Sequence, residues 1–125
     1  MSVPAYNTVA WFQIGSDEPD RVKTFYRDLF GWTFTPDPAG EGKYDLVGYP
    51  GAEIPQGGIA HTPDASGNHA IFYVVVEDVT ATLAAVEQHG GKVSQPPVTG
   101  SDGLVFAEVQ DTSGNRFGVF TPAPK

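Results

Sequence analysis

Residues 9–32 read VAWFQIGSDEPDRVKTFYRDLFGW, and this stretch predicts a strand followed by an amphipathic helix. The run 9–14 has the composition of a strand. Helix-start signals follow it directly, and they are Ser16, Asp17, Glu18 and Pro19. Apolar residues then recur three and four positions apart, at Val22, Phe25, Tyr26 and Leu29. Because Gly31 comes after this face, we expect it to end the helix as a left-handed cap.

The same order of signals returns from residue 69. HAIFYVVV (69–76) predicts a strand, Asp78 is placed to cap a second helix, and Gly90 and Gly91 end it. Three shorter strand-like runs follow each helix, at 32–35, 43–48 and 56–60 and again at 92–94, 103–110 and 115–121. The chain therefore predicts two strand-helix-strand-strand-strand repeats, 8–60 and 69–121, offset by about 60 residues and joined by a linker over 61–68.

The predicted fold class is α+β, with two βαβββ modules that share a curved mixed sheet around a cavity in a single domain over residues 1–125. Neither repeat can bury both faces of its strands alone, which favours pairing of the two. Alternation places Phe12 and Phe72 under their helices and Trp11 and Tyr73 on the open face. Loops 36–42 and 94–103, rich in proline and glycine, are expected to shape the cavity.

The composition excludes several classes of function. The 125 residues carry a formal net charge of −8 and no cysteine, so thiolate metal sites and disulfides are excluded and nucleic acid is not an expected partner. No run approaches the roughly 20 apolar residues that cross a bilayer, and the first residues lack the pattern of a signal peptide. We therefore expect a cytoplasmic protein that does not contact a membrane.

Three segments carry a resemblance to a known family: DEPDRVKTFYRDLFGW (17–32), EDVTATLAAVEQHGGKV (77–93) and DTSGNRFGVF (111–120). With the duplicated plan, they resemble the vicinal oxygen chelate superfamily, which includes glyoxalase I, extradiol dioxygenases, fosfomycin-modifying enzymes and bleomycin resistance proteins. The resemblance implies paired modules around a cavity, often in dimers, and a homodimer is expected here. It also implies, in metal-dependent members, four ligands from the first and last strands of both modules.

The positions of this sequence that match those four ligands are Trp11, Gly58, Ile71 and Gly118. Divalent cations need carboxylate or imidazole ligands, which none of these residues supplies. We therefore predict no metal and no cofactor. Because glycine weakens a strand, Gly58 and Gly118 call for an explanation, and we expect them to leave open space for a planar ligand.

The predicted ligand-binding residues share the open face of the strands, and they are Trp11, Gln13, Gly58, His69, Ile71, Tyr73, Phe106, Glu108, Gly118 and Phe120. Aromatic rings stack on planar ligands and attract cations. The leading interpretation is therefore a metal-free protein of the glyoxalase and bleomycin-resistance type. It would sequester an aromatic or cationic small molecule such as an antibiotic or a secondary metabolite, without catalysis.

Three alternatives remain. The first is a metal-independent isomerase or cyclase, with no catalytic residue assigned, whose acid and base would come from His69, Glu108, Tyr73 or Glu53. The second is a metal-dependent lyase or dioxygenase with a displaced site built from His61, His69 and Glu53. The third is a stress or regulatory protein that acts through its surface. His61 is expected on the opposite face from His69, and His89 is expected to have a structural role at the end of the second helix.

Overall fold

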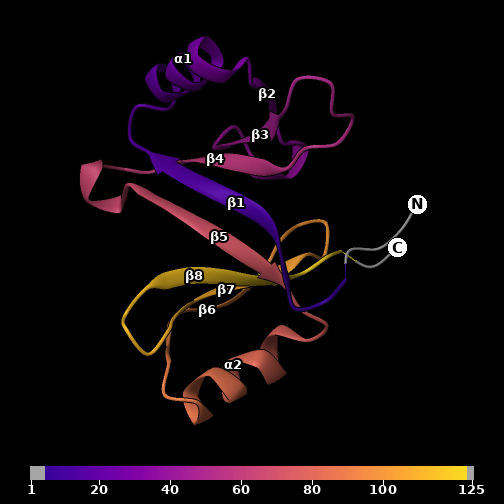
Figure 1. Cartoon of the computed structure of the whole chain (residues 1–125), viewed down its shortest axis with the longest axis vertical. Helices are drawn as coiled ribbons and strands as arrows, with labels where there is room; N and C mark the ends of the chain where they lie inside the picture. The colour runs from indigo at the N-terminus through magenta and orange to yellow at the C-terminus, as the bar shows by residue number, and fades with distance from the viewer. Residues whose placement is uncertain (1–4, 124–125) are drawn as a thin grey trace. The chain divides into compact units, whose positions relative to one another are not determined.

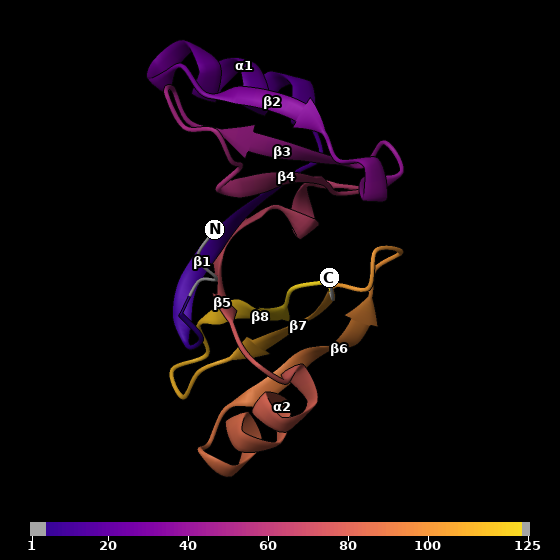
Figure 2. The ribbon, with the colours of Figure 1, turned by 90° about the vertical axis from the view of Figure 1, so that its right-hand side faces the viewer.

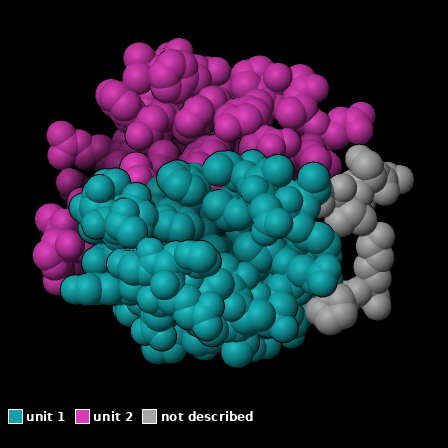
Figure 3. Space-filling view, turned by 60° about the horizontal axis from the view of Figure 1, so that its bottom comes forward, with its two compact units in different colours: residues 1–10, 71–125 teal, residues 11–70 magenta. Residues whose placement is uncertain are grey.

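The computed structural model describes residues 5–123 and divides the chain into two compact units. Unit 1 comprises residues 1–10 and 71–125, and unit 2 comprises residues 11–70 (Figure 3). The unit boundaries fall near the start of the first strand of each predicted repeat. Each unit is therefore one βαβββ repeat, except for the beginnings of two strands. Residues 8–10 of the first strand are assigned to unit 1, and residues 69–70 of the fifth strand are assigned to unit 2.

Unit 2 follows the order strand, helix, strand, strand, strand (Figures 1 and 2). Its elements are β1 (Thr8–Ser16, with residues from Trp11 in unit 2), α1 (Pro19–Phe30), β2 (Thr33–Pro36), β3 (Tyr44–Gly48) and β4 (Gly57–His61). Single turns of 3₁₀-helix lie at Pro38–Gly40 and Ala65–Gly67. The strands are ordered β2-β3-β4-β1, with β4 parallel to β1 and the other pairs antiparallel.

Unit 1 repeats this plan, and Figure 2 shows α2 beside β6, β7 and β8. Its elements are β5 (His69–Val75, with residues from Ile71 in unit 1), α2 (Val79–Gln88), β6 (Lys92–Thr99), β7 (Val105–Gln110) and β8 (Arg116–Thr121). The strand order is β5-β8-β7-β6, with β5 parallel to β8 and the other pairs antiparallel. Parallel pairing of the first and last strands is therefore common to both units.

The helix ends follow the local sequence signals. Gly31 ends α1 in the left-handed region at φ 73°, and the Asp78 side chain accepts a hydrogen bond from the Ala81 amide at the start of α2. At the start of α1 the N-cap is Glu18, and the amide of Glu18 donates to the Ser16 hydroxyl at 2.9 Å. The predicted start of α1 at Pro19 is confirmed, but Glu18 makes no side-chain cap hydrogen bond, and the Ser16 hydroxyl accepts from the N-cap amide two residues later.

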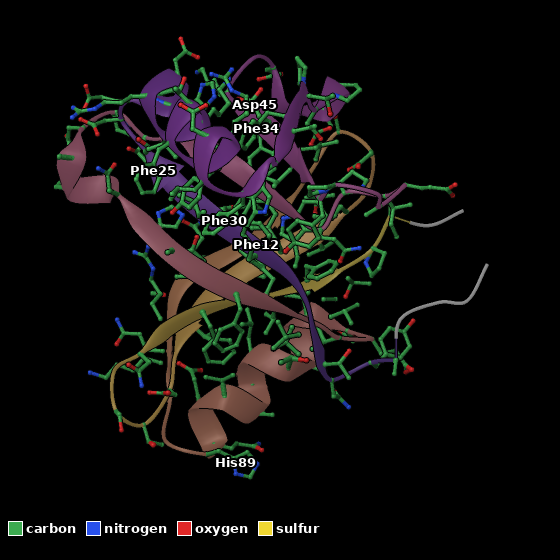
Figure 4. The ribbon with its side chains drawn as sticks, turned by 45° about the horizontal axis from the view of Figure 1, so that its top comes forward. Phe12, Phe25, Phe30, Phe34, Asp45 and His89 are labelled. Carbon is green, nitrogen blue, oxygen red and sulfur yellow. The ribbon has the colours of Figure 1, made fainter. Side chains whose placement is uncertain are left out.

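The two units have different interiors. Unit 1 buries an aliphatic cluster beneath α2, made of Val76, Val79, Leu83, Ala107, Val109 and Val119. In unit 2, Val47 and Ile59 are fully buried in the sheet, and α1 contacts it through rings. Those rings are Phe12, Tyr26, Phe30, Trp32 and Tyr49, with centroids of neighbouring rings 5.0–6.4 Å apart. In Figure 4, Phe12 and Phe30 lie close together in this cluster.

The predicted fold class is confirmed as a mixed α+β fold, with eight strands and two α-helices among residues 5–123. The sixth strand is longer than expected: it extends from Lys92 to Thr99, where the sequence predicted a loop from residue 94. Its pairing with β7 shifts register between Gln95 and Val98, where Pro96 and Pro97 cannot donate to the ladder. The common cavity, the shared sheet and the single-domain organisation stay predictions.

No helix within the described part of the chain has both the length and the apolar character needed to cross a bilayer.

Candidate functional site

The predicted site residues of unit 2 lie on the face of the sheet opposite α1. Strand alternation separates Trp11 and Gln13 from Phe12, whose ring packs against Trp32 on the helix side. Gln13 is the direct neighbour of Gly58 across the parallel β1–β4 pair. The structure therefore brings Trp11, Gln13, Gly58 and His69 together, as the sequence predicted for these four residues.

Trp11 is held by Tyr44, which is not among the ten predicted site residues. The indole Nε1 of Trp11 donates to the hydroxyl of Tyr44 at 3.0 Å. The Tyr44 ring lies over Gly58, so that a Cβ built at Gly58 would overlap the phenol. Burial raises the pKa of Tyr44 to about 12, against the opposing effect of the hydrogen bond from Trp11. The phenol is therefore neutral at physiological pH and can donate a hydrogen bond.

His69 has a defined tautomer. Its Nδ1 lies 2.8 Å from the carbonyl oxygen of Gly67, which can only accept, so Nδ1 carries the proton. In the neutral imidazole, Nε2 is then an acceptor, and the Gln13 amide donates to it at 2.9 Å. The ring also lies over Gly15, where a Cβ would overlap it. The result is an oriented imidazole with its basic nitrogen next to a side-chain amide.

Unit 1 presents the other six predicted residues on the corresponding face. Cross-strand pairs place Phe106 beside Phe120 and Glu108 beside Gly118, and Tyr73 is the direct neighbour of Gly118. The Tyr73 and Phe120 rings meet edge to face, with centroids 6.3 Å apart. Ile71, two residues before Tyr73, has the same strand parity and is half-buried. The parity that the sequence predicted for β5, β7 and β8 is therefore confirmed.

Glu108 is not a free carboxylate. The Nε of Arg116 lies 3.3 Å from its Oε1, and the two side chains lie on the same face of neighbouring strands. The pairing directs the Glu108 carboxylate towards Arg116. As a general base, it would first have to leave this ion pair.

One expectation about the glycines is wrong. We expected Gly58 and Gly118 to leave open space for a ligand, but the ring of Tyr44 occupies the space over Gly58 and the ring of Tyr73 occupies that over Gly118. An aromatic ring that covers a glycine on a neighbouring strand compensates for the missing side chain. The glycines therefore make room for tyrosine rings that belong to the protein.

Tyr44 could have been found from the sequence. Residues 43–48 already predicted a strand next to the one that carries Gly58, and Tyr44 alternates with the inward-facing Asp45 and Val47. A tyrosine diagonally across from a strand glycine is the signal.

The donor set does not fit a metal ion at the positions implied by the resemblance. An indole, an isoleucine and two glycines covered by rings provide no carboxylate or imidazole ligand. Within residues 5–123, no three His, Asp or Glu side chains form a group that could hold an ion. His61, His69 and Glu53 are therefore not brought together, which contradicts the displaced metal site.

His61 lies on the α1 side of the sheet, as its spacing from Gly58 predicted. Its Nε2 donates to Asp45 Oδ2 at 2.9 Å, and Lys23 of α1 reaches the same oxygen at 3.2 Å. Burial of Asp45 acts to raise its pKa, but the hydrogen bonds and charges of His61 and Lys23 together lower it below the usual carboxyl value. This cluster ties α1 to the sheet and is separate from the candidate site.

A depression of about 580 Å³ lies beside α1 in unit 2. Its lining residues include Lys23, Arg27, Trp32 and Phe34, and none of the ten predicted site residues is among the described residues that line it. Lys23 is paired with Asp45 and Arg27 with Asp28, at 3.2 and 3.4 Å. Its cations thus already have carboxylate partners.

Comparison with known families gives a match over residues 8–119 to the model described as the Glyoxalase/Bleomycin resistance protein/Dioxygenase superfamily. A "Glyoxylase-like domain-containing protein" of Didymella fabae is 28% identical over 121 residues, which are 93% of this chain and 94% of that protein. CFP32 of Mycobacterium tuberculosis, which carries glyoxylase in its name, is 31% identical over 94% of this chain. The match spans 45% of the length of CFP32.

Solved structures share the fold at lower identity. Methylmalonyl-CoA epimerase from Mycobacterium tuberculosis superposes with a TM-score of 0.69 at 17% identity, over 99% of this chain and 94% of the other. The Mn(II)-bound glyoxalase from Novosphingobium aromaticivorans gives 0.65 at 20% identity, over 96% of this chain and 40% of the other. At these identities the likeness establishes the fold alone.

Proposed function

The chain belongs to the Glyoxalase/Bleomycin resistance protein/Dioxygenase superfamily, and we propose that it binds an aromatic or cationic small molecule, such as an antibiotic or a secondary metabolite, without a metal ion. The observation that carries the proposal is the chemistry at the four positions matching metal ligands. Trp11, Gly58, Ile71 and Gly118 offer an indole, an aliphatic side chain and two backbone segments covered by tyrosine rings. Rings and neutral donors suit an organic ligand better than an ion.

The partners of Trp11 supply the polar part of this proposal. Tyr44 is a neutral phenol, Gln13 an amide and His69 an imidazole, and all three are half-buried in unit 2. A ligand stacked on the indole would gain about 0.5–2 kcal/mol from each ring it contacts. The net charge of −8 favours a cationic ligand over an anionic one through the field of the whole protein.

Elemental analysis of the protein purified without chelators tests the metal-free part. We expect less than roughly one ion of zinc, iron, manganese or nickel per ten chains. Ions at this level would be bound adventitiously to a surface without clustered ligands. Addition of these ions to the purified protein should leave its thermal midpoint unchanged. A stoichiometric ion that survives dialysis would overturn this part.

Equilibrium dialysis with paired probes tests the ligand class. Acridine and phenanthridine dyes serve as planar cations, and naphthalene sulfonates serve as planar anions of similar size. We expect saturable binding of at least one cationic probe, and loss of that binding in Trp11→Ala. Trp32→Phe is the matched control. It changes the other tryptophan, which lies in the ring cluster beside α1, and it should bind as the wild type does. Equal binding by Trp11→Ala would place the ligand elsewhere.

A metal-independent enzyme is the second candidate, and the oriented imidazole of His69 favours it. Nδ1 is fixed on Gly67, so Nε2 could accept a proton from a ligand that displaces Gln13. Mass spectrometry of a bound compound after incubation separates the two candidates. Recovery of unchanged compound supports sequestration. Conversion that is lost in His69→Gln while binding is kept would support the enzyme.

A further inference from the structure

The depression beside α1 lies in unit 2 and is separate from the candidate site. Its described lining residues all come from the continuous stretch 20–34, which runs through α1 and into β2. Figure 2 shows β2 directly beside α1. The volume of about 580 Å³ lies within the range of roughly 300–1,000 Å³ that is usual for small-molecule sites. The depression is therefore large enough for a small organic molecule.

Arg27 brings unused hydrogen-bond donors to the depression. Its Nε lies 3.4 Å from Asp28 Oδ1, and within residues 5–123 no hydrogen bond or ion pair engages its two terminal nitrogens. A guanidinium has five N–H donors in a planar fork that matches the geometry of a carboxylate. Both side chains of the pair with Asp28 are more than half exposed, so this pair holds Arg27 only weakly. Arg27 can therefore bind a second carboxylate without giving up a buried contact.

The backbone of β2 supplies one more donor. β2 is the outer strand of unit 2 and pairs with β3. The amide of Asp37 donates to the carbonyl oxygen of Tyr44 at 3.0 Å, which sets the alternation of this antiparallel ladder. Two and four residues earlier, Thr35 and Thr33 therefore direct their backbone groups towards β3. Phe34, which lies between them, directs its N–H away from β3, so this N–H has no partner in the ladder.

The ring of Phe34 forms an apolar wall of the depression. Phe34 pairs with Val47 across the two strands, so both side chains lie on the same face of the sheet as Asp45. Figure 4 shows Phe34 close to Asp45. Trp32 is stacked on Tyr26, but the half-buried Phe34 is not stacked on any ring within the described residues. Its ring can therefore lie against a planar ligand.

The other charged groups restrict the ligand to a single negative charge. Lys23 lies 3.2 Å from Asp45 and 3.4 Å from Asp20, so two carboxylates already balance its charge. Asp20 also lines the depression and repels anions. The positive charge left for a ligand is mainly that of Arg27. A monoanion therefore suits the depression better than a phosphate or another multiply charged group.

We propose that the depression beside α1 is a second binding site, which takes a planar aromatic carboxylate. The carboxylate binds the guanidinium of Arg27, and the ring lies along Phe34. The N–H of Phe34 donates to the second carboxylate oxygen or to an acceptor atom on the ring. This site uses none of the ten residues of the candidate site, and its proposed ligand has the opposite charge to the cation favoured there. The inference is therefore independent of the proposed function.

Equilibrium dialysis of the full chain with 2-naphthoate tests the proposal, and the neutral 2-naphthamide is the matched probe. The wild type should bind 2-naphthoate saturably with one molecule per chain, and it should bind 2-naphthamide about tenfold more weakly because the charge-assisted pair is lost. Arg27→Gln should weaken the binding of 2-naphthoate about tenfold for the same reason. Arg27→Lys keeps the charge but not the fork, so it should bind with intermediate affinity.

Arg21→Gln is the matched control for these variants. Arg21 is also an exposed arginine of α1, but it is not among the described lining residues, so this variant should bind 2-naphthoate as the wild type does. Trp11→Ala should also bind it normally, because Trp11 belongs to the candidate site. Circular dichroism checks that α1 is retained in each variant. Equal binding by Arg27→Gln and the wild type, or loss of binding in Trp11→Ala, would overturn the proposal.

A measurement on the wild type tests the location without any substitution. In ¹H–¹⁵N spectra, 2-naphthoate should shift the backbone amide resonance of Phe34 and the Nε–H resonance of Arg27 with a common saturation curve. The amides of Trp11, Gln13 and His69 should stay in place. Absence of saturable shifts, or shifts confined to the candidate site, would overturn the proposal, whereas the planar cations bound or not bound at Trp11 decide the proposed function separately.

Discussion

The two α-helices occupy the same place in the βαβββ order, but different kinds of contact hold them to their sheets. α2 buries Val79 and Leu83 in an aliphatic cluster with Ala107, Val109 and Val119. None of the described residues of α1 is buried. Its contacts include ring stacking between Tyr26 and Trp32, at 5.0 Å, the contact of Phe30 with Trp32, and the ion pair of Lys23 with Asp45.

This difference affects how firmly each helix is held to its sheet and whether the helix exposes apolar side chains. A buried aliphatic side chain contributes about 1.5–3 kcal/mol, whereas an aromatic pair adds about 0.5–1.5 kcal/mol beyond its buried area. We therefore expect α2 to be held more firmly than α1. Phe25 and Leu29 of α1 are exposed, whereas α2 buries Val79 and Leu83.

The largest expected effect is that of Leu83→Ala in α2. Leu83 is 9% exposed within the aliphatic cluster, and its truncation should lower the free energy of unfolding by about 3 kcal/mol through lost burial and a cavity. Leu29→Ala, the same type of substitution in α1, should lower the free energy of unfolding by less than about 0.5 kcal/mol because that side chain is exposed. Urea denaturation of dilute protein measures both values.

Hydrogen exchange followed by mass spectrometry localises this effect. The amides of α2 should exchange faster in Leu83→Ala than in the wild type. Within the wild type, the amides of α1 should exchange faster than those of α2. Slower exchange in α1 than in α2 would contradict the comparison between the two helices.

Asp45 tests how α1 is held, and its expected effect is smaller. Asp45→Asn replaces the carboxylate shared by His61 and Lys23 with a neutral amide, which removes the negative charge and leaves one acceptor oxygen for both groups. Because Lys23 and His61 keep some contact with water, we expect a loss of about 2 kcal/mol at pH 7, less than for a fully buried pair. Asp20→Asn removes the other, exposed partner of Lys23 and should cost less than about 0.5 kcal/mol.

The pH dependence of the Asp45 contribution follows from the sign of its shift. The pKa of Asp45 is lowered in the folded protein, so its contribution is complete above the ordinary carboxyl value of about 4 and is lost as the pH falls through the lower folded value. The stabilities of wild type and Asp45→Asn should therefore differ at pH 7 and converge towards pH 3. A difference that stays constant between these pH values would exclude the charge as its source.

Much of the fold could be predicted from the sequence because its signals are local. Pro19 and Gly31 bound α1, Asp78 caps α2, and strand alternation assigned Trp11 and Tyr73 to the face opposite the helices. The extent of β6 could not be predicted in the same way. Its second half contains Pro96 and Pro97 and pairs with β7 only through shifted register, which depends on the neighbouring strand.

The candidate site was predicted less completely. The parity of the strands gave its residues, but the partner of each residue comes from another strand. Tyr44 over Gly58 and Tyr73 over Gly118 are cross-strand contacts, which no single segment reveals. The apolar face of α1 shows a second limit. Helical spacing placed Phe25 and Leu29 on one apolar face, and such a face usually packs against a core, whereas the fold leaves both side chains exposed.

The smallest expected effects concern the two glycines, and they sharpen the comparison between the repeats. Gly118→Ala places a Cβ against the Tyr73 ring, which is 4% exposed and has little room to move, so we expect a loss of about 1.5 kcal/mol. Gly58→Ala meets the hydroxyl end of the half-buried Tyr44, which can swing away at the expense of its hydrogen bond with Trp11, for a loss of about 1 kcal/mol or less.

A double-mutant cycle decides why these glycines are present. If Gly118 makes room for Tyr73, then Tyr73→Ala relieves the overlap, and Gly118→Ala should cost almost nothing in that background. In the first repeat, Gly58→Ala should change the fluorescence of Trp11 by displacing Tyr44, and the change should be absent in a Tyr44→Ala background. Additive losses at Gly118 and Tyr73 would mean that the glycine serves something other than the ring, such as a ligand that enters over the bare backbone.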